Sequence, residues 1–191
     1  MKRKFLIIFT LIILFECIFI INKSFATVDQ AGYTITNYDV DMVVNEDNSI
    51  DVTEIIDVFF SEERHGIFRT IPLKNTVERE DGTITKNKVK IENIKVNESY
   101  TDSIISNVLE IKIGDANKTV SGYQTYEISY TYRIGKDPLK DVDELYYNII
   151  GTLWTTNIEH VDFRITMPED FDESKLGFTS GTKGSVRKLK C

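Results

Sequence analysis

The sequence predicts an all-β domain, an antiparallel β-sandwich of immunoglobulin-like architecture, preceded by an N-terminal signal or anchor helix. Three observations carry this prediction. Apolar and polar residues alternate with a period of two in several segments after residue 32. Turn-forming pairs such as Asp81-Gly82 and Ser121-Gly122 separate those segments. No helical repeat follows the N-terminal apolar run, and many short strands divided by turns are typical of sandwiches.

The N-terminal residues have the features of an export signal. A basic stretch at residues 2–4 precedes apolar residues 5–21, and Ser24 and Ala26 form an S-x-A signal peptidase site. We therefore expect residues 1–26 to be a signal peptide, cleaved after Ala26. The alternative is an uncleaved anchor, although 17 residues are at the short limit for a span and Glu16 would be costly in hydrocarbon.

Charge and cysteine content narrow the possible partners and the source of stability. The 191 residues have a formal charge of -7, and removing residues 1–26 takes away four Lys or Arg and one Glu, which makes it -10. Nucleic acid and anionic lipid surfaces are therefore excluded as favoured partners. Cys17 lies in the signal, where Glu16 replaces the small residue that a lipobox needs, and Cys191 is the last residue. The mature domain must be stabilised by its core, without an internal disulfide.

The first strands after the signal are predicted to form a hairpin. Residues 33–44 place one apolar set on a single face, residues 45–48 (NEDN) have the composition of a turn, and residues 49–60 resume the alternation. The inward set of the first segment is Tyr38, Val40, Met42 and Val44, and that of the second is Ile50, Val52, Ile56, Val58 and Phe60.

Further strands are predicted at residues 88–96, 107–114, 123–134 and 160–168. In the last of these, we expect Val161, Phe163, Ile165 and Met167 to face inward. Residues 141–150 are ambiguous between a helical turn and a strand. The C-terminal residues become Gly/Ser-rich and basic without an apolar strand, so we expect a single domain over residues 27–191 that is truncated at its C-terminal end.

Several spaced motifs resemble the N-terminal extracytoplasmic domain of the bacterial membrane proteins grouped as domain of unknown function 2207. The resemblance extends from about Tyr33 to Gly184. Its motifs, in order, are VTE (52–54), GIFRTIP (66–72), IKIGD (111–115), SGYQTYEISYTY (121–132), DELYYNIIGTLW (143–154) and VDFRITMP (161–168).

The resemblance implies an exported β-rich domain whose parent protein continues into transmembrane helices and a variable cytoplasmic tail. This sequence ends at Cys191, before any such helix, so we expect a fragment, a gene truncated by a frameshift, or a short paralogue. The resemblance brings no agreed biochemical activity. It implies attachment to the membrane through the signal anchor or through the missing downstream helices.

Glu54 and Arg69 are the two charged residues whose positions in the sequence suggest an ion pair. Glu54 shares the inward phase of Val52 and Ile56, where an unpaired carboxylate would be expensive. Arg69 lies in the GIFRTIP motif, and its guanidinium can hold a carboxylate bidentately. We predict a partly buried ion pair that fastens a loop at residues 64–72 to the second strand. In the alternative, Arg69 faces solvent and binds an anion.

Other candidate residues have structural interpretations. Gly66 suits a tight turn, and Pro72 favours extended geometry before it. Trp154 is expected to anchor the core, or else to offer an aromatic platform for a sugar ring of the cell wall. Tyr126, Tyr130 and Tyr132 share the face of Ile128, which favours packing. The complete predicted structural motif is Glu54, Gly66, Arg69, Pro72, Gly114, Gly151 and Trp154, with Arg69 and Trp154 as candidate binding residues.

Catalytic and metal sites have little support in the sequence. His65 and His160 are the only histidines, and alternation places His160 on the outward face with Asp162 and Arg164. An acidic cluster at residues 137–144 lacks the glycine of an EF-hand loop, and Pro138 interrupts it. We therefore predict no catalytic residue, no metal and no cofactor.

The function expected from these observations is non-enzymatic. The leading expectation is a domain on the extracytoplasmic face of the bacterial cell membrane that binds, senses or scaffolds, with an envelope protein or a cell-wall ligand as its partner. The alternative is a cell-wall carbohydrate-binding or hydrolytic domain that uses exposed carboxylates and aromatics, since 29 acidic residues remain after cleavage. A purely structural module in a larger envelope complex is the third possibility.

Overall fold

The computed structural model describes residues 32–78, 84–135, 145, 147–172, 176–180 and 187–189. The predicted signal or anchor and the acidic cluster at residues 137–144 therefore lie outside the described residues. Among the described residues, no helix has the length and apolar character needed to cross a membrane.

The described part of the chain is all-β, as the alternation predicts. Its strands are β1 (Tyr33–Val44), β2 (Ser49–Arg64), β3 (Ile67–Pro72), β4 (Lys74–Glu78), β5 (Ile84–Val96), β6 (Tyr100–Ile105), β7 (Val108–Ile113), β8 (Val120–Ile134), β9 (Val161–Thr166), β10 (Phe178–Ser180) and β11 (Arg187–Leu189).

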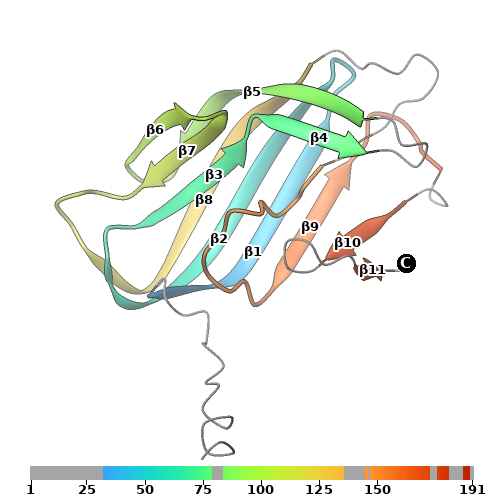
Figure 1. Ribbon diagram of the computed structural model, residues 1–191. Coiled ribbons are helices and arrows are strands. Elements are labelled where there is room, and N and C mark those ends of the chain that lie inside the picture. Colours follow the sequence, from blue (N-terminus) through green and yellow to red (C-terminus); the bar gives the residue numbers. More distant parts are fainter. Residues whose placement is uncertain are drawn as a thin grey trace, which may run out of the picture.

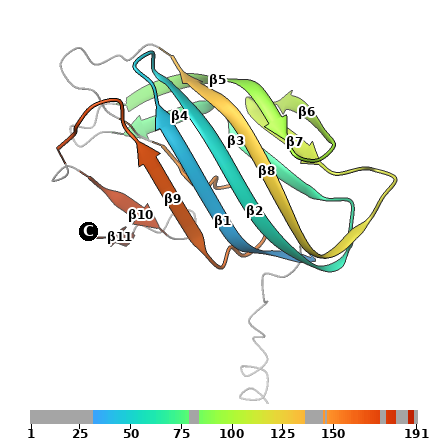
Figure 2. The same ribbon diagram turned by 180° about the vertical axis from the view of Figure 1, so that it is seen from behind.

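The strands form two main sheets and a small hairpin. One sheet has six strands in the order β4-β5-β8-β2-β1-β9, another has three in the order β3-β7-β6, and β10 pairs with β11. The three-stranded sheet lies over one face of the six-stranded sheet (Figure 1), and Figure 2 views the opposite face, with β9, β1, β2 and β8 in front. Buried apolar side chains of both sheets, including Ile56 of β2 and Ile111 of β7, belong to one core cluster.

The predicted first hairpin is confirmed. β1 and β2 pair antiparallel, with Tyr38 opposite Ile56, and the turn at residues 45–48 contains Asn48 at φ 61°. Tyr38, Val40 and Met42 are buried, whereas the polar residues between them face outward. The period-two pattern therefore identified both the strands and the face of the sheet that builds the core.

The last predicted strand differs from expectation in its direction and burial. β9 pairs parallel with β1, with Tyr38 opposite Val161, so the larger sheet is mixed and not purely antiparallel. Val161 and Phe163 are 37% and 45% exposed, against the predicted inward set, because β9 is the edge strand of its sheet. Ile165 and Met167 are half-buried.

The segment at residues 64–72 is not the predicted loop. β2 continues to Arg64, and residues 67–72 form β3, which pairs antiparallel with β7 over its whole length. β4, β6, β10 and β11 are also strands that the alternation did not identify, and the last two lie in the C-terminal segment where the sequence predicts no apolar strand. In the ambiguous stretch 141–150, the described residues Leu145 and 147–150 belong to neither helix nor strand.

Candidate functional site

Glu54 and Arg69 meet in the interior, between the two sheets. Glu54 comes from β2, where its neighbours in phase, Val52 and Ile56, are buried, and Arg69 comes from β3, between the buried Ile67 and Ile71. The exposed fraction is 0% for Glu54 and 2% for Arg69. Strand alternation thus directs one acidic and one basic side chain into the same apolar layer.

The two side chains form a bidentate ion pair. Arg69 Nε donates to Glu54 Oε2 at 2.7 Å, and Arg69 Nη2 donates to Glu54 Oε1 at 2.6 Å. The predicted pairing is present, but the pair is fully buried and links two strands instead of fastening a loop. The alternative arrangement, with Arg69 facing solvent to bind an anion, does not match a side chain that is 2% exposed.

Two tyrosines complete the coordination of the Glu54 carboxylate. Tyr38 of β1 donates its hydroxyl to Oε2 at 2.8 Å, and Tyr130 of β8 donates to Oε1 at 2.7 Å. The hydroxyls of Tyr130 and Tyr147 lie 3.2 Å apart. Each oxygen of Glu54 therefore accepts two hydrogen bonds, which satisfies a buried carboxylate.

The electrostatics of this cluster keep the ion pair charged. Burial raises the pKa of Glu54, but the Arg69 charge and the hydrogen bonds from Arg69, Tyr130 and Tyr38 outweigh it and hold the pKa below its usual range. Burial raises the pKa of Tyr38 and of Tyr130 well above the usual value, so both hydroxyls remain donors. The cluster is thus suited to hold the sheets together and is poorly suited to proton transfer.

Gly151 and Trp154 cover the guanidinium of Arg69. Arg69 Nη1 donates to the carbonyl of Thr70 at 2.7 Å and lies 2.8 Å from where a Cβ of Gly151 would be. The Trp154 ring centroid is 5.9 Å from Arg69 Cζ and 5.8 Å from the Tyr38 ring, edge to face. The sequence places Arg69, Gly151 and Trp154 in one predicted motif, but it does not indicate that they touch.

The Trp154 ring packs inward, in keeping with the core-anchoring expectation. Its Nε1 is buried and has no hydrogen-bond partner among the described residues. A cavity of about 30 Å³, which is room for a water molecule, borders Arg69. The cavity is lined by Arg69, Ile71, Pro72, Tyr132, Tyr147, Asn148, Gly151 and Thr152.

Gly66 and Gly114 face each other where β3 and β7 meet. Both have φ of +126°, and a Cβ on Gly66 would lie 1.9 Å from the carbonyl oxygen of Ile113. A Cβ on Gly114 would lie 1.9 Å from the carbonyl oxygen of His65. Pro72 ends β3 opposite Val108. The predicted tight turn at Gly66 is therefore one side of a reciprocal close approach between two backbones.

The two histidines occupy exposed positions with separate partners. His65 Nδ1 lies 2.8 Å from the Lys118 carbonyl oxygen, and His160 Nε2 lies 2.9 Å from Asp162 Oδ2. His160 faces outward beside Asp162, as predicted. Within the residues that the structure describes, no three His, Cys, Asp or Glu side chains form a metal-binding group.

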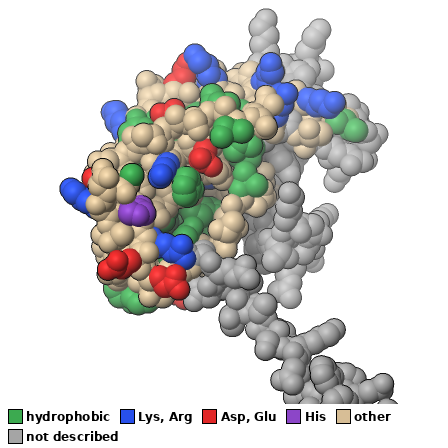
Figure 3. All heavy atoms as spheres, turned by 60° about the vertical axis from the view of Figure 1, so that its left-hand side comes forward, with side chains coloured by type: hydrophobic (Ala, Val, Ile, Leu, Met, Phe, Trp, Pro, Cys, Tyr) green, Lys and Arg blue, Asp and Glu red, His purple; other side chains and the backbone are tan. Residues whose placement is uncertain are grey.

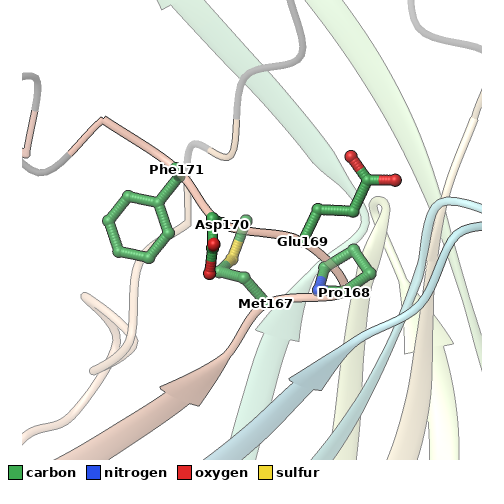
Figure 4. Close-up of a pocket in the computed structure, with 5 residues that line it drawn as sticks. All are labelled: Met167, Pro168, Glu169, Asp170 and Phe171. Atoms are coloured by element: carbon green, nitrogen blue, oxygen red, sulfur yellow. The ribbon is translucent and has the colours of Figure 1, made fainter.

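A larger hollow of about 570 Å³ lies after β9, and Figure 4 shows the residues that line it. It is lined by five consecutive residues, Met167 to Phe171, and the side chains of Glu169 and Phe171 point away from each other. None of the predicted site residues lines it. It therefore gathers no set of polar groups that converge on one point.

An exposed aromatic pair lies on the outer face of the six-stranded sheet. Phe59 of β2 and Tyr123 of β8 are cross-strand partners with ring centroids 4.9 Å apart, and they are 39% and 75% exposed. In the next row, Thr125 donates to Asp57 at 2.6 Å. Alternation correctly placed Tyr126, Tyr130 and Tyr132 inside, but it did not single out this outward pair.

Comparison with family models gives one match, over residues 34–190, to the family described as the N-terminal domain of a predicted membrane protein (DUF2207). Comparison with curated proteins finds no match. The match covers both main sheets apart from Tyr33, the first residue of β1, and it includes Glu54, Arg69, Tyr38 and Tyr130.

Two of the solved structures with some likeness to this chain are the following. An M1 zinc metallopeptidase from Deinococcus radiodurans has 14% identity and a TM-score of 0.40, with 85% of this chain and 41% of that chain covered. Native leukotriene A4 hydrolase from Saccharomyces cerevisiae has 12% identity and a TM-score of 0.32, with 58% and 17% covered. This chain thus spans less than half the length of either protein.

Proposed function

The chain belongs to the DUF2207 family of predicted membrane proteins, whose N-terminal domain it carries, and from this premise we propose that it is a non-enzymatic domain that binds, senses or scaffolds at the bacterial cell envelope. The domain is exported to the extracytoplasmic face of the cell membrane, where its two sheets form an immunoglobulin-like sandwich. Its partner is an envelope protein or a cell-wall ligand.

The fully engaged Glu54 carboxylate is the observation that carries this proposal. A general acid or a nucleophile needs a free proton or lone pair directed at a substrate. Glu54 instead accepts four hydrogen bonds from Arg69, Tyr38 and Tyr130 in a layer without solvent access. The fully buried charged groups Glu54 and Arg69 thus support a rigid body, which is what a binding or scaffolding domain requires.

Labelling of single cysteines in intact cells tests the proposed address. In a C17S/C191S background, Tyr123→Cys is expected to react with a membrane-impermeant maleimide once the outer layers are made permeable, because Tyr123 is 75% exposed. Ile128→Cys is the matched control on the same strand, since Ile128 is 0% exposed and should react only after denaturation. Labelling of Tyr123→Cys only after the cell membrane is lysed would overturn the extracytoplasmic assignment.

Cell-wall carbohydrate binding is a second candidate, favoured by the Phe59–Tyr123 pair. An exposed aromatic face can stack on a sugar ring, and the hydrogen-bonded Asp57 and Thr125 lie beside it. The expected result is that the full chain sediments with insoluble peptidoglycan and that Tyr123→Ala abolishes this. Phe68→Ala is the control, because Phe68 is also exposed but lies on the smaller sheet. Equal sedimentation of all three proteins would reject this candidate.

A further inference from the structure

Strand β6 is an edge strand whose side chains face solvent. It ends the order β3-β7-β6, and residues 101–105 are all exposed. Ile104 and Ile105, on opposite faces of the strand, are 66% and 62% exposed. Figure 3, which brings the β6–β7 side of the molecule forward, shows hydrophobic side chains among charged ones on this face.

The backbone of β6 presents a free set of hydrogen-bonding groups along its outer edge. The Gly114 N–H donates to the Ser99 carbonyl at 2.7 Å, which places the backbone groups of Ser99, and by alternation those of Thr101, Ser103 and Ile105, toward β7. The N–H and C=O groups of Asp102 and Ile104 therefore point away from β7. No partner for them is found among the residues that the structure describes.

The other edge strands of the two main sheets, β9, β4 and β3, carry features that oppose strand addition, whereas β6 has few. β9 carries Asp162 and Arg164, β4 begins with Lys74, and Gly151 lies against the Thr70 carbonyl of β3. Charged side chains and covering segments are the usual protection of an edge. The only charged residue of β6 is Asp102.

We propose that β6 pairs antiparallel with β6 of a second copy of this chain, about a two-fold axis through Ser103. The two three-stranded sheets then become one continuous sheet across the dimer. This inference goes beyond the proposed function and does not depend on it, because it rests on the strand edge alone.

The register follows from charge and from strand length. A two-fold axis perpendicular to the sheet keeps each side chain on its own face, so odd-numbered residues lie opposite odd-numbered ones and even-numbered residues opposite even-numbered ones. The axis therefore passes midway between two copies of the same residue, and not between two neighbouring positions. Centring on Asp102 sets two carboxylates directly opposite, which is unfavourable. Centring on Ile104 overlaps only residues 103–105, because Ser106 and Asn107 have positive φ and leave the strand.

Centring on Ser103 pairs residues 101–105 of both copies and sets Asp102 opposite Ile104. The outward N–H and C=O groups of both residues are then satisfied. The Ser103 groups point toward β7, so the two Ser103 residues form a non-hydrogen-bonded pair, in which the Cα atoms lie about 4.5 Å apart. That separation suits a disulfide between two introduced cysteines.

Cysteine cross-linking of the purified full chain in detergent tests this register. In a C17S/C191S background, Ser103→Cys is expected to give a disulfide-linked dimer on mild oxidation. Thr101→Cys is the matched control on the same strand and face, since two Thr101 residues would lie four positions apart, about 13 Å. A monomeric Ser103→Cys protein, or equal linkage of Thr101→Cys, overturns the proposal.

A second arm tests the hydrogen bonds of the edge. Added to Ser103→Cys, Ile104→Pro removes the outward N–H without touching the bonds to β7, whereas Ile104→Thr removes the apolar side chain but keeps the N–H. Because one hydrogen bond is lost from each copy, Ile104→Pro should reduce dimer formation about tenfold relative to Ile104→Thr. Equal rates of cross-linking for the two variants would contradict pairing through the edge.

Discussion

At the scale of single residues, the carboxylate of Glu54 is held by side chains that reach it from three other strands. Arg69 comes from β3, Tyr38 from β1 and Tyr130 from β8. Removing two charges from water is costly, and only good geometry with further hydrogen bonds offsets that cost. The tyrosine hydroxyls supply those further bonds. The buried pair therefore fixes how β1, β2, β3 and β8 lie relative to one another. Packing of apolar side chains alone would not fix that arrangement.

A double-mutant cycle is expected to show strong coupling between Glu54 and Arg69. Either Glu54→Gln or Arg69→Ala leaves a buried polar or charged group without its partner, which should lower the free energy of unfolding by about 3–5 kcal/mol. The double variant should lose clearly less than the sum of the two single losses, as measured by urea denaturation.

The exposed pair Asp41–Arg164 provides the control for this cycle. Its nearest atoms are 3.6 Å apart and its side chains are 53% and 77% exposed, so its coupling should be within about 0–1 kcal/mol. Additive losses for Glu54 and Arg69 would mean that the two side chains do not stabilise each other.

The lowered pKa of Glu54 predicts how stability depends on pH. A carboxyl group whose pKa is lower in the folded state binds fewer protons there, so its contribution is fully present above the unfolded pKa of about 4.3. That contribution is lost as the pH falls through the folded pKa. The difference in unfolding free energy between the wild type and Glu54→Gln should therefore be constant above about pH 5 and shrink in more acidic buffer. Urea titrations at several pH values measure it, and a difference that stays constant down to about pH 2 would contradict the lowered pKa.

Sequence reasoning reached part of this cluster. The phase of Glu54 along its strand and the charge of Arg69 were enough to predict that they pair, because an inward charge needs a partner. The same alternation placed Tyr38 and Tyr130 inside. It could not predict that their hydroxyls reach Glu54, because that contact depends on how β1 and β8 flank β2. The covering of Arg69 by Gly151 and Trp154 depends on the path of an irregular segment, which no periodicity describes.

At the scale of elements, the β3–β7 pair depends on two glycines that allow the strands to approach. Gly66→Ala and Gly114→Ala should each lower the free energy of unfolding by at least about 3 kcal/mol, because the new Cβ meets a backbone carbonyl oxygen that has no room to move. Thermal or urea unfolding measures the loss, and the soluble yield serves where a variant does not fold.

Gly122→Ala is the matched control for this prediction. Gly122 also has positive φ, at 70°, but nothing lies within 4 Å of its added Cβ. It should cost only about 1–2 kcal/mol for the backbone conformation. If Gly66→Ala were as stable as Gly122→Ala, the close approach of β3 and β7 would not be a constraint on this fold.

The elements found and missed by the pattern differ in physical ways. β1, β2 and β8 are long and half-buried, so their alternation is unambiguous. The sequence of β3 predicts a loop because Gly66 and Pro72 bound it and because a charged residue, Arg69, occupies an inward position. β6 has exposed residues on both faces and so lacks the contrast that alternation needs. The parallel direction of β9 leaves no signal, since a strand has the same period whichever way its neighbour runs.

At the scale of the whole molecule, membership of a family of predicted membrane proteins raises the question of whether the N-terminal segment is cleaved or remains as an anchor. We expect the mature chain to begin at Thr27, because Ser24 and Ala26 supply the small residues that signal peptidase needs. Intact-mass measurement of protein recovered from the envelope should show the loss of residues 1–26. Ala26→Tyr should block the cleavage and leave the full mass. Retention of residues 1–26 in the unmodified chain would instead indicate an anchor.

The parallel pairing of β1 with β9 has a mechanical consequence. The chain enters the domain at the start of β1 and leaves the larger sheet at the end of β9, and these points lie at opposite ends of the paired strands. Tension applied between them loads the β1–β9 hydrogen bonds together in shear, whereas an antiparallel pair held in a hairpin opens one bond at a time. A domain stretched between two fixed points would therefore resist extension at this seam, and the parallel strand pair would set the force at which it yields.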